Sequence, residues 1–153
     1  EVSMAIILAA LTRSFLIAII SIGVFSLIVD MPISNIMIII IFGFLSAFIL
    51  GSLGFITGLW AEKYDHTATV TNFVITPLSF LSGVFYSIDK LPKFFQIISH
   101  VNPFFYMIDG FRYGFLGKSD SSISVGLIYL SILSVVMWYV AFFLYKKGYK
   151  IKS

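Results

Sequence analysis

Four long apolar runs constrain this chain more than any other feature of its sequence. A bilayer hydrocarbon core about 30 Å thick needs about 20 apolar residues in a helix. The chain has such runs at about 5–29, 33–59, 67–87 and 123–145. Only 11% of its 153 residues are charged, against roughly 25% in soluble domains. The sequence therefore predicts an all-α integral membrane protein, with four transmembrane helices in one domain over residues 1–153.

The remaining composition narrows the class of partner. The chain has no cysteine, so it offers neither disulfides nor thiolate metal ligands. Its formal charge is +3, and the basic residues gather at the ends of the apolar runs, which favours lipid headgroups over nucleic acid as the neighbour of these charges. Because the chain begins at Glu1 without a leader-like segment, we expect it to be a fragment of a longer protein.

Small residues of the second run share one face of its predicted helix. At about 100° per residue they fall within a stripe roughly 80° wide. Such a stripe lets another helix backbone approach closely inside a membrane. We expect this face to pack against a helix, with a place on a transport route as the alternative. The stripe consists of Gly43, Ala47, Gly51, Gly54 and Gly58.

The third run carries a polar stripe at helical spacing. Polar groups of a spanning helix seldom face lipid, because each unsatisfied group costs free energy there. The stripe therefore faces either another helix or a water-lined route, and the sequence leaves both open. Pro77 removes a backbone hydrogen bond and predicts a kink, which the neighbouring Thr76 could partly satisfy. The stripe consists of Thr69, Asn72, Thr76, Ser79 and Gly83.

Two further segments that start near a proline are too short to cross a bilayer. The first, about 92–100, has one apolar face and is expected to lie at the membrane surface. The second, about 103–116, has Asn102 as its N-cap, Pro103 at its first position and Gly117 as its terminator. Its length of about 21 Å is less than the bilayer core. Since it is apolar nearly all round, it either dips into the membrane or packs inside the bundle.

Asp109 and Arg112 are the two charged residues of this second short helix. They are three residues apart, so they can pair on the helix surface. An arginine beside several apolar side chains needs a partner, because desolvation of an unpaired charge is costly. We interpret the pair as a structural brace, with a gate or a substrate contact as the alternative.

The basic residues also predict an orientation. Lys146, Lys147, Lys150 and Lys152 follow the last run, and such clusters mark the cytoplasmic side. With four spans, the turn that contains Lys63 lies on the same side, while the two short helices lie outside. We place Arg13, inside the first run, near one interface, because an arginine at the bilayer centre costs about 2.5 kcal/mol or more.

Sequence motifs for a self-contained enzyme are missing. The chain has no G-x-x-x-x-G-K-[ST] phosphate loop, and we expect it to bind no cofactor itself. Its two histidines, His66 and His100, fall on opposite membrane sides in the predicted topology, so no metal site is expected. We therefore expect a transport subunit without catalytic residues.

Three segments resemble a known family. They are G-L-W-A-E-K-Y-D at 58–65, N-F-V-I-T-P-L-S-F-L-S-G-V-F-Y-S-I-D-K-L-P at 72–92 and N-P-F-F-Y-M-I-D-G-F-R-Y-G-F-L-G at 102–117. Together they are similar to the membrane permeases of ABC type-2 exporters, in the bacterial branch of drug, nodulation-factor and polysaccharide exporters. The resemblance is specific for the family and not for the cargo.

The resemblance implies a six-span subunit of the bacterial cytoplasmic membrane, of which this chain would hold the last four spans. Such a subunit dimerises and binds an ABC ATPase, which holds the ATP and Mg²⁺. The short helices would be re-entrant helices on the outer side, and a cytoplasmic loop would face the ATPase. That loop would consist of Glu62, Lys63, Tyr64 and Asp65.

From these features we expect an ATP-driven exporter that works by alternating access. Its cargo would be amphipathic, drug-like, or linked to a glycan or lipid, and the polar stripe would line or gate the route. Two alternatives remain open: an ATP-independent channel or carrier, and a non-transporting assembly subunit. A carrier would need ionisable groups inside its spans, and the runs contain few.

Overall fold

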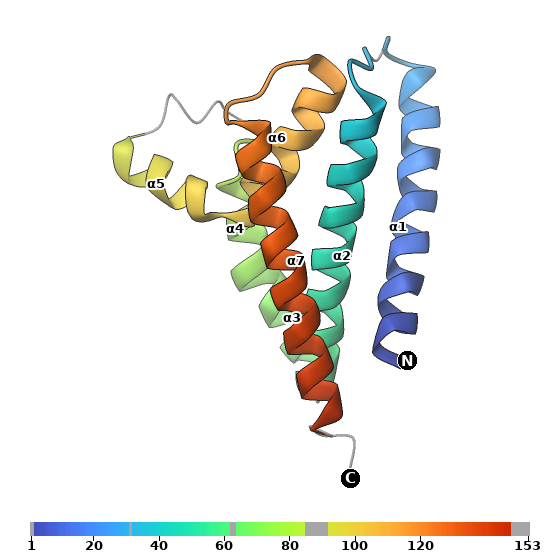
Figure 1. The fold of residues 1–153 in the computed structure, drawn as a ribbon, viewed down its shortest axis with the longest axis vertical. Helices are drawn as coiled ribbons and strands as arrows, with labels where there is room; N and C mark the ends of the chain where they lie inside the picture. Colours follow the sequence, from blue (N-terminus) through green and yellow to red (C-terminus); the bar gives the residue numbers. More distant parts are fainter. Residues whose placement is uncertain (1, 31, 62–63, 85–91, 148–153) are drawn as a thin grey trace.

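A computed structural model describes residues 2–30, 32–61, 64–84 and 92–147 of the chain (Figure 1). Every regular element within these residues is a helix. In chain order the helices are α1 (Val2–Ser26), α2 (Ile36–Trp60), α3 (Tyr64–Val70), the π-helical segment η1 (Thr71–Ile75), α4 (Thr76–Phe80), α5 (Lys93–Val101), α6 (Pro103–Leu116) and α7 (Ile123–Lys146).

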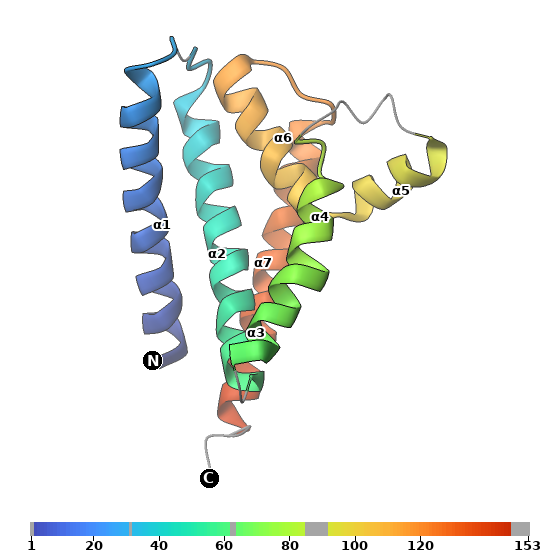
Figure 2. The same cartoon turned by 180° about the vertical axis from the view of Figure 1, so that it is seen from behind.

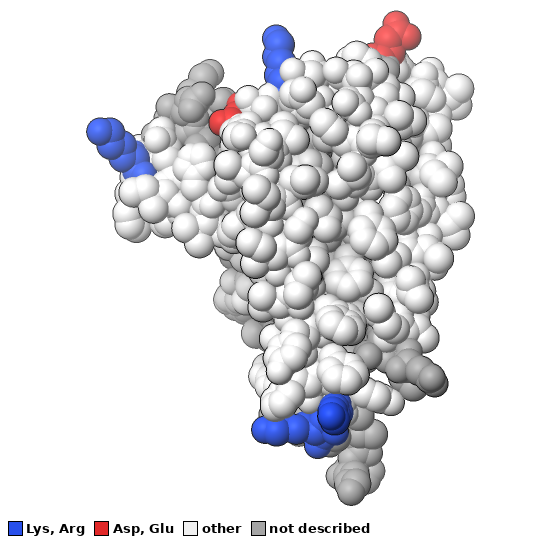
Figure 3. Space-filling model, viewed as in Figure 1, with Lys and Arg blue, Asp and Glu red and all other residues white. Residues whose placement is uncertain are grey.

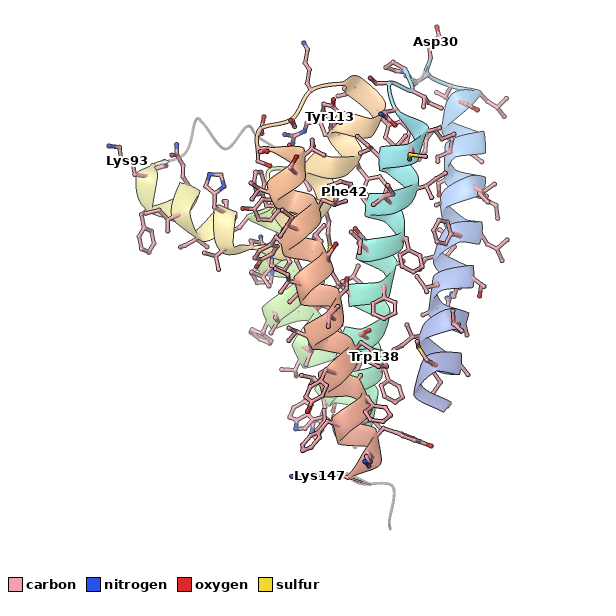
Figure 4. The ribbon with its side chains drawn as sticks, in the orientation of Figure 1. Asp30, Phe42, Lys93, Tyr113, Trp138 and Lys147 are labelled. Atoms are coloured by element: carbon pink, nitrogen blue, oxygen red, sulfur yellow. The ribbon has the colours of Figure 1, made fainter. Side chains whose placement is uncertain are left out.

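Three helices are long and apolar enough to cross a membrane: Met4–Ser26 within α1, Ile36–Trp60 (α2) and Ile123–Lys146 (α7). Apart from Arg13, most of the described charged residues lie toward the two ends of the molecule, and the face in Figure 3 has a broad uncharged belt between them. Asp30 marks one end and Lys147 the other (Figure 4). We call these the Asp30 end and the Lys147 end. This distribution is that of an integral membrane protein.

The third predicted run, 67–87, forms a composite helix and is not among the three long helices. Helix α3, segment η1 and helix α4 follow one another from Tyr64 to Phe80, and Gly83 then adopts a left-handed φ of 79°. A left-handed residue ends a right-handed helix, and glycine adopts it without strain. The helix therefore stops before residue 87, where the sequence interpretation ends the run, and residues 85–91 lie outside the described part. Four spans remain a prediction.

The core forms where α6 lies between α2 and α7. Its buried apolar side chains come from these three helices: Phe42, Ile49, Phe105, Tyr106, Met107 and Leu130. Asn35 caps α2, because its Oδ1 accepts hydrogen bonds from Met37 N and Ile38 N. The same turn donates to α6, since Asn35 N lies 2.8 Å from Gly114 O. The C-terminal end of α6 is thereby fixed beside the start of α2.

Of the two arrangements predicted for residues 103–116, the structure has the packed one, with α6 inside the bundle. Asn102 caps α6 by accepting from Phe104 N at 3.0 Å, and Gly117 ends it at φ 69°. The helix has 14 residues and is therefore about 21 Å long, so it lies beside only part of the 25-residue α2. Helix α5 projects sideways from the start of α6 (Figures 1 and 2). Together α5 and α6 form a hairpin whose turn, at Asn102, lies between the two ends of the bundle.

The placement of Arg13 near a membrane interface stays a prediction, because the structure contains no membrane. The residue is near the middle of α1, which runs from Val2 to Ser26, and its side chain is exposed. Near Arg13, helices α1 and α2 approach each other closely. A Cβ added at Gly51 in α2 would lie 3.2 Å from the Cβ of Ala10 in α1. Arg13 lines a groove of about 640 Å³ between α1 and α2.

Glycine at position 110 is expected to be required for the packing of α6 on α2. A Cβ there would lie 2.0 Å from the ring of the buried Phe42. We expect Gly110→Ala to lower stability by about 1–3 kcal/mol, the usual cost of overpacking. The measurement is the thermal midpoint of the full-length protein in detergent or nanodiscs.

Gly54→Ala is the matched control, because a Cβ at Gly54 meets nothing within 4 Å. Alanine also has the higher helix propensity, so this control should be neutral or slightly stabilising. Equal midpoints for the two variants would contradict the packing described for α6.

Candidate functional site: the polar helix and its clasp

The polar stripe of the third run lies on the stretch α3–η1–α4. Its hydroxyls bond within their own helix: Thr69 Oγ1 donates to Asp65 O at 2.8 Å, and Ser79 Oγ donates to Ile75 O at 2.8 Å. Back-bonding of this kind satisfies a hydroxyl without a partner from another helix. Thr69, Asn72 and Thr76 are exposed, so most of the stripe does not pack against the rest of the described chain.

Asn72 differs from the hydroxyl residues of the stripe. Its amide makes no side-chain hydrogen bond within the described residues, and the side chain is exposed. A primary amide has two donor hydrogens and an acceptor oxygen, which would be costly to leave unsatisfied in lipid. The face that carries Asn72 therefore requires water or a polar surface from outside the described chain.

A wide helical turn stands immediately before Pro77. Segment η1 is π-helical, and both the backbone N–H and the Oγ1 of Thr76 donate to Thr71 O, the latter at 3.0 Å. The carbonyl that loses its helical donor at Pro77 is Phe73 O, four residues earlier, and not Thr71 O, so the prediction that Thr76 satisfies the backbone beside Pro77 stays a prediction. A π-turn next to proline is a common cause of a bend in a helix and often occurs at functional sites. The kink itself stays a prediction.

Three side chains of the α5–α6 hairpin donate hydrogen bonds to the carbonyl groups at and just beyond the end of α4. Such carbonyls have no donor within their own helix. Asn102 Nδ2 donates to Leu78 O at 2.6 Å, and Ser99 Oγ donates to Leu81 O at 3.0 Å. The third donor is Arg112, whose Nη2 lies 2.6 Å from Gly83 O. We call these three hydrogen bonds the α4 clasp.

Asp109 and Arg112 belong to a larger network than the predicted pair. Their closest charged atoms are 3.8 Å apart, whereas Arg112 Nη1 lies 2.6 Å from Asp120 Oδ2. Asp109 is 1% exposed and accepts from Asp120 N, Ser121 N and Ser121 Oγ. Helical spacing could not indicate Asp120, because it lies in the turn that follows α6. The network joins α6, the end of α4 and the start of α7.

The small-residue stripe of α2 is only partly in contact. A Cβ at Gly43 would lie 3.5 Å from Phe111, and Gly51 faces Ala10, whereas Gly54 and Gly58 have open space. Ala47 lines the grooves on this face. The tightest glycine contacts are on α6, where a Cβ at Gly114 would lie 2.4 Å from Ile39. Sequence periodicity of the second run could not reveal them.

The predicted ATPase-facing loop lies at the turn between α2 and α3. Glu62 and Lys63 fall outside the described residues, as does the side chain of Tyr64. Asp65 is exposed in the first turn of α3. The end of α2 and the first turn of α3 are at the Lys147 end of the molecule (Figure 2). Within the described part of the chain, no three His, Asp or Glu side chains are grouped so that they could hold a metal ion.

Comparison with known proteins identifies the class of the chain. Residues 1–116 match the family model described as ABC-2 type transporter. The chain is 39% identical over 109 residues to the inner membrane transport permease YadH of Escherichia coli K12, covering 71% of this chain and 43% of that protein. It is 34% identical over 90 residues to nodulation protein J of Rhizobium leguminosarum bv. viciae, covering 59% of this chain and 35% of that protein. The chain thus spans less than half the length of these relatives. No solved structure matches it significantly.

Arg112→Ala is expected to destabilise the protein more than Lys118→Ala. Arg112 bonds both Asp120 and Gly83 O, whereas Lys118 is exposed. A hydrogen bond to a charged group contributes about 1.5–3 kcal/mol, and the 22% exposure of the Arg112 side chain places the expected loss near the lower figure. The measurement is the thermal midpoint, together with the protein level in membranes. Equal values for the two variants would contradict the network.

Proposed function

Because this chain belongs to the ABC-2 type transporter family, we propose that it is the membrane-spanning part of an ATP-driven exporter. Its relatives are membrane transport permeases, and its three long apolar helices agree with that class. ATP would be bound and hydrolysed in a separate ABC ATPase, while this chain and a second copy of it would form the route.

The proposal rests on the polar face of α3–η1–α4. Thr69, Asn72 and Thr76 are exposed on an otherwise strongly apolar molecule, and the amide of Asn72 has no partner within the described chain. A water-lined route between helices would satisfy this face, whereas lipid would not. The hydroxyl back-bonds lower the cost of passing an amphipathic cargo, because these groups are already satisfied when water is displaced.

The two ends of the molecule would have different roles in transport. We propose that the Lys147 end is cytoplasmic, since Lys146 is the last residue of α7 and Lys147 follows it there. The α2–α3 turn at this end would receive the movement of the ATPase. The Asp30 end would then face outward, with the α5–α6 hairpin beside the exit. Alternating access would require the composite helix to change its position, so that the route opens first at the Lys147 end and then at the Asp30 end.

The cargo class follows from the mixed character of the composite helix, whose polar face would line the route and whose apolar face would meet lipid. Hydroxyl and amide groups share the composite helix with exposed apolar side chains such as Phe73 and Val74. We propose an amphipathic cargo, either drug-like or a glycan carried on a lipid.

Reconstitution is the direct test of this function. The full-length permease and its ATPase would be placed in proteoliposomes, and the movement of fluorescent lipids, drugs and lipid-linked glycans would be followed. We expect movement of at least one class that requires ATP and is abolished by an inactive ATPase. Movement without ATP would favour a channel or carrier, and association without any movement would favour an assembly subunit.

Asn72→Leu should lower the transport rate about tenfold, equivalent to about 1.4 kcal/mol, because it removes the amide from the proposed route. Phe73→Leu is the neighbouring control, since Phe73 is 77% exposed and apolar. The measurement is the initial rate of ATP-dependent movement at equal protein level. A rate for Asn72→Leu equal to that of Phe73→Leu would remove Asn72 from the route.

A further inference from the structure

The composite helix is attached to the rest of the chain mainly at its ends. No residue of η1 or α4 is buried, so apolar packing contributes little to their position within this chain. At the Lys147 end, the rings of Trp60 and His66 lie 5.3 Å apart and join α2 to α3. At the other end, the α4 clasp holds the carbonyls of residues 78, 81 and 83.

Asn102 is the central member of the clasp because one amide serves two helices. Its Oδ1 accepts from Phe104 N and caps α6, while its Nδ2 donates to Leu78 O in the last turn of α4. The residue is 2% exposed, and Ser99 beside it is fully buried. Because both side chains are buried, water does not compete for the hydrogen bonds of Asn102 while the clasp is closed.

A joint of this kind can open at low cost. Hydrogen bonds to terminal carbonyls can be replaced by hydrogen bonds to water, whereas an apolar interface would expose hydrophobic surface when it opens. The bend needed for opening is also present, because the π-turn of η1 stands directly before Pro77. The hairpin itself is fixed to α2 and α7 by the core around Phe105 and Tyr106. Helix α4 is therefore the part free to move.

We propose that the α4 clasp is a latch, closed in this structure, and that α4 swings away from the α5–α6 hairpin about the η1 segment when the latch opens. Asn102 is the positioning residue of the closed state. Arg112 holds the far end of the latch and connects it, through Asp120, to the turn before α7. The latch would gate the outer end of the route, and that consequence rests on the proposed function. The motion itself does not.

The test measures the distance between α4 and α5 in the full-length permease in nanodiscs, without nucleotide. Nitroxide labels would be attached to cysteines placed at Phe80 in α4 and Ile97 in α5, which are 55% and 66% exposed. These 153 residues contain no cysteine of their own. The variant is Asn102→Asp, which can still cap α6 but cannot donate to Leu78 O. We expect the ratio of long to short distances to rise at least about fivefold, equivalent to about 1 kcal/mol.

Asn35→Asp is the matched control, because Asn35 caps α2 and none of its hydrogen bonds joins that cap to α4. We expect its distance distribution to equal that of the unsubstituted protein. An unchanged distribution in Asn102→Asp, or the same broadening in both variants, would overturn the latch. Should Asn102→Asp fail to fold, Ser99→Ala removes one clasp bond with a smaller change, and about a fivefold shift is again expected. No shift in Ser99→Ala would then overturn the proposal.

The distance measurement and the transport assay fail independently. A shifted distance in a protein that moves no cargo would refute the exporter and leave the latch standing. ATP-dependent transport with unshifted distances would refute the latch and leave the exporter standing.

Discussion

A helix that ends inside a membrane protein must find hydrogen-bond donors for its last carbonyls in the protein or in water, because lipid offers none. Helix α4 ends in this way, and the α5–α6 hairpin supplies the donors. The turn of that hairpin places Asn102 and Ser99 against α4, while Arg112 reaches Gly83 O from further along α6. The position of the polar helix in the described chain therefore depends on three hydrogen bonds more than on hydrophobic contact.

The hairpin can supply these donors only because α6 is itself held firmly. Gly110 and Gly114 let α6 approach α2 more closely than any larger residue would allow. The buried carboxylate of Asp109 accepts three hydrogen bonds from the turn before α7, and its own helix carries Arg112 toward Asp120. Rigid apolar packing on one side of the hairpin and exchangeable polar contacts on the other divide the molecule into a fixed part and a movable part.

Sequence reasoning reached much of this arrangement because local rules govern it. Asn102, Pro103 and Gly117 each have a preference that defines a helix boundary, and the boundaries of α6 follow from them. Contacts between distant residues have no such local signal. The pairing of Arg112 with Asp120, the donation from Asn102 to Leu78 O and the early end at Gly83 all depend on where separate helices meet. Likewise, Pro77 indicates a lost backbone hydrogen bond and a kink, but no local signal indicates the π-turn before it.

The central claim is that the polar face of the composite helix lines a water-accessible route. Single cysteines placed at each position from 69 to 80 in the full-length permease, in native membranes, test it through their reaction with a small membrane-impermeant maleimide. We predict fast labelling at 69, 72 and 76. Positions 73, 74 and 80, which hold apolar residues, serve as the reference and should be labelled slowly. Uniform protection of the stripe, or fast labelling on the opposite face, would contradict the account.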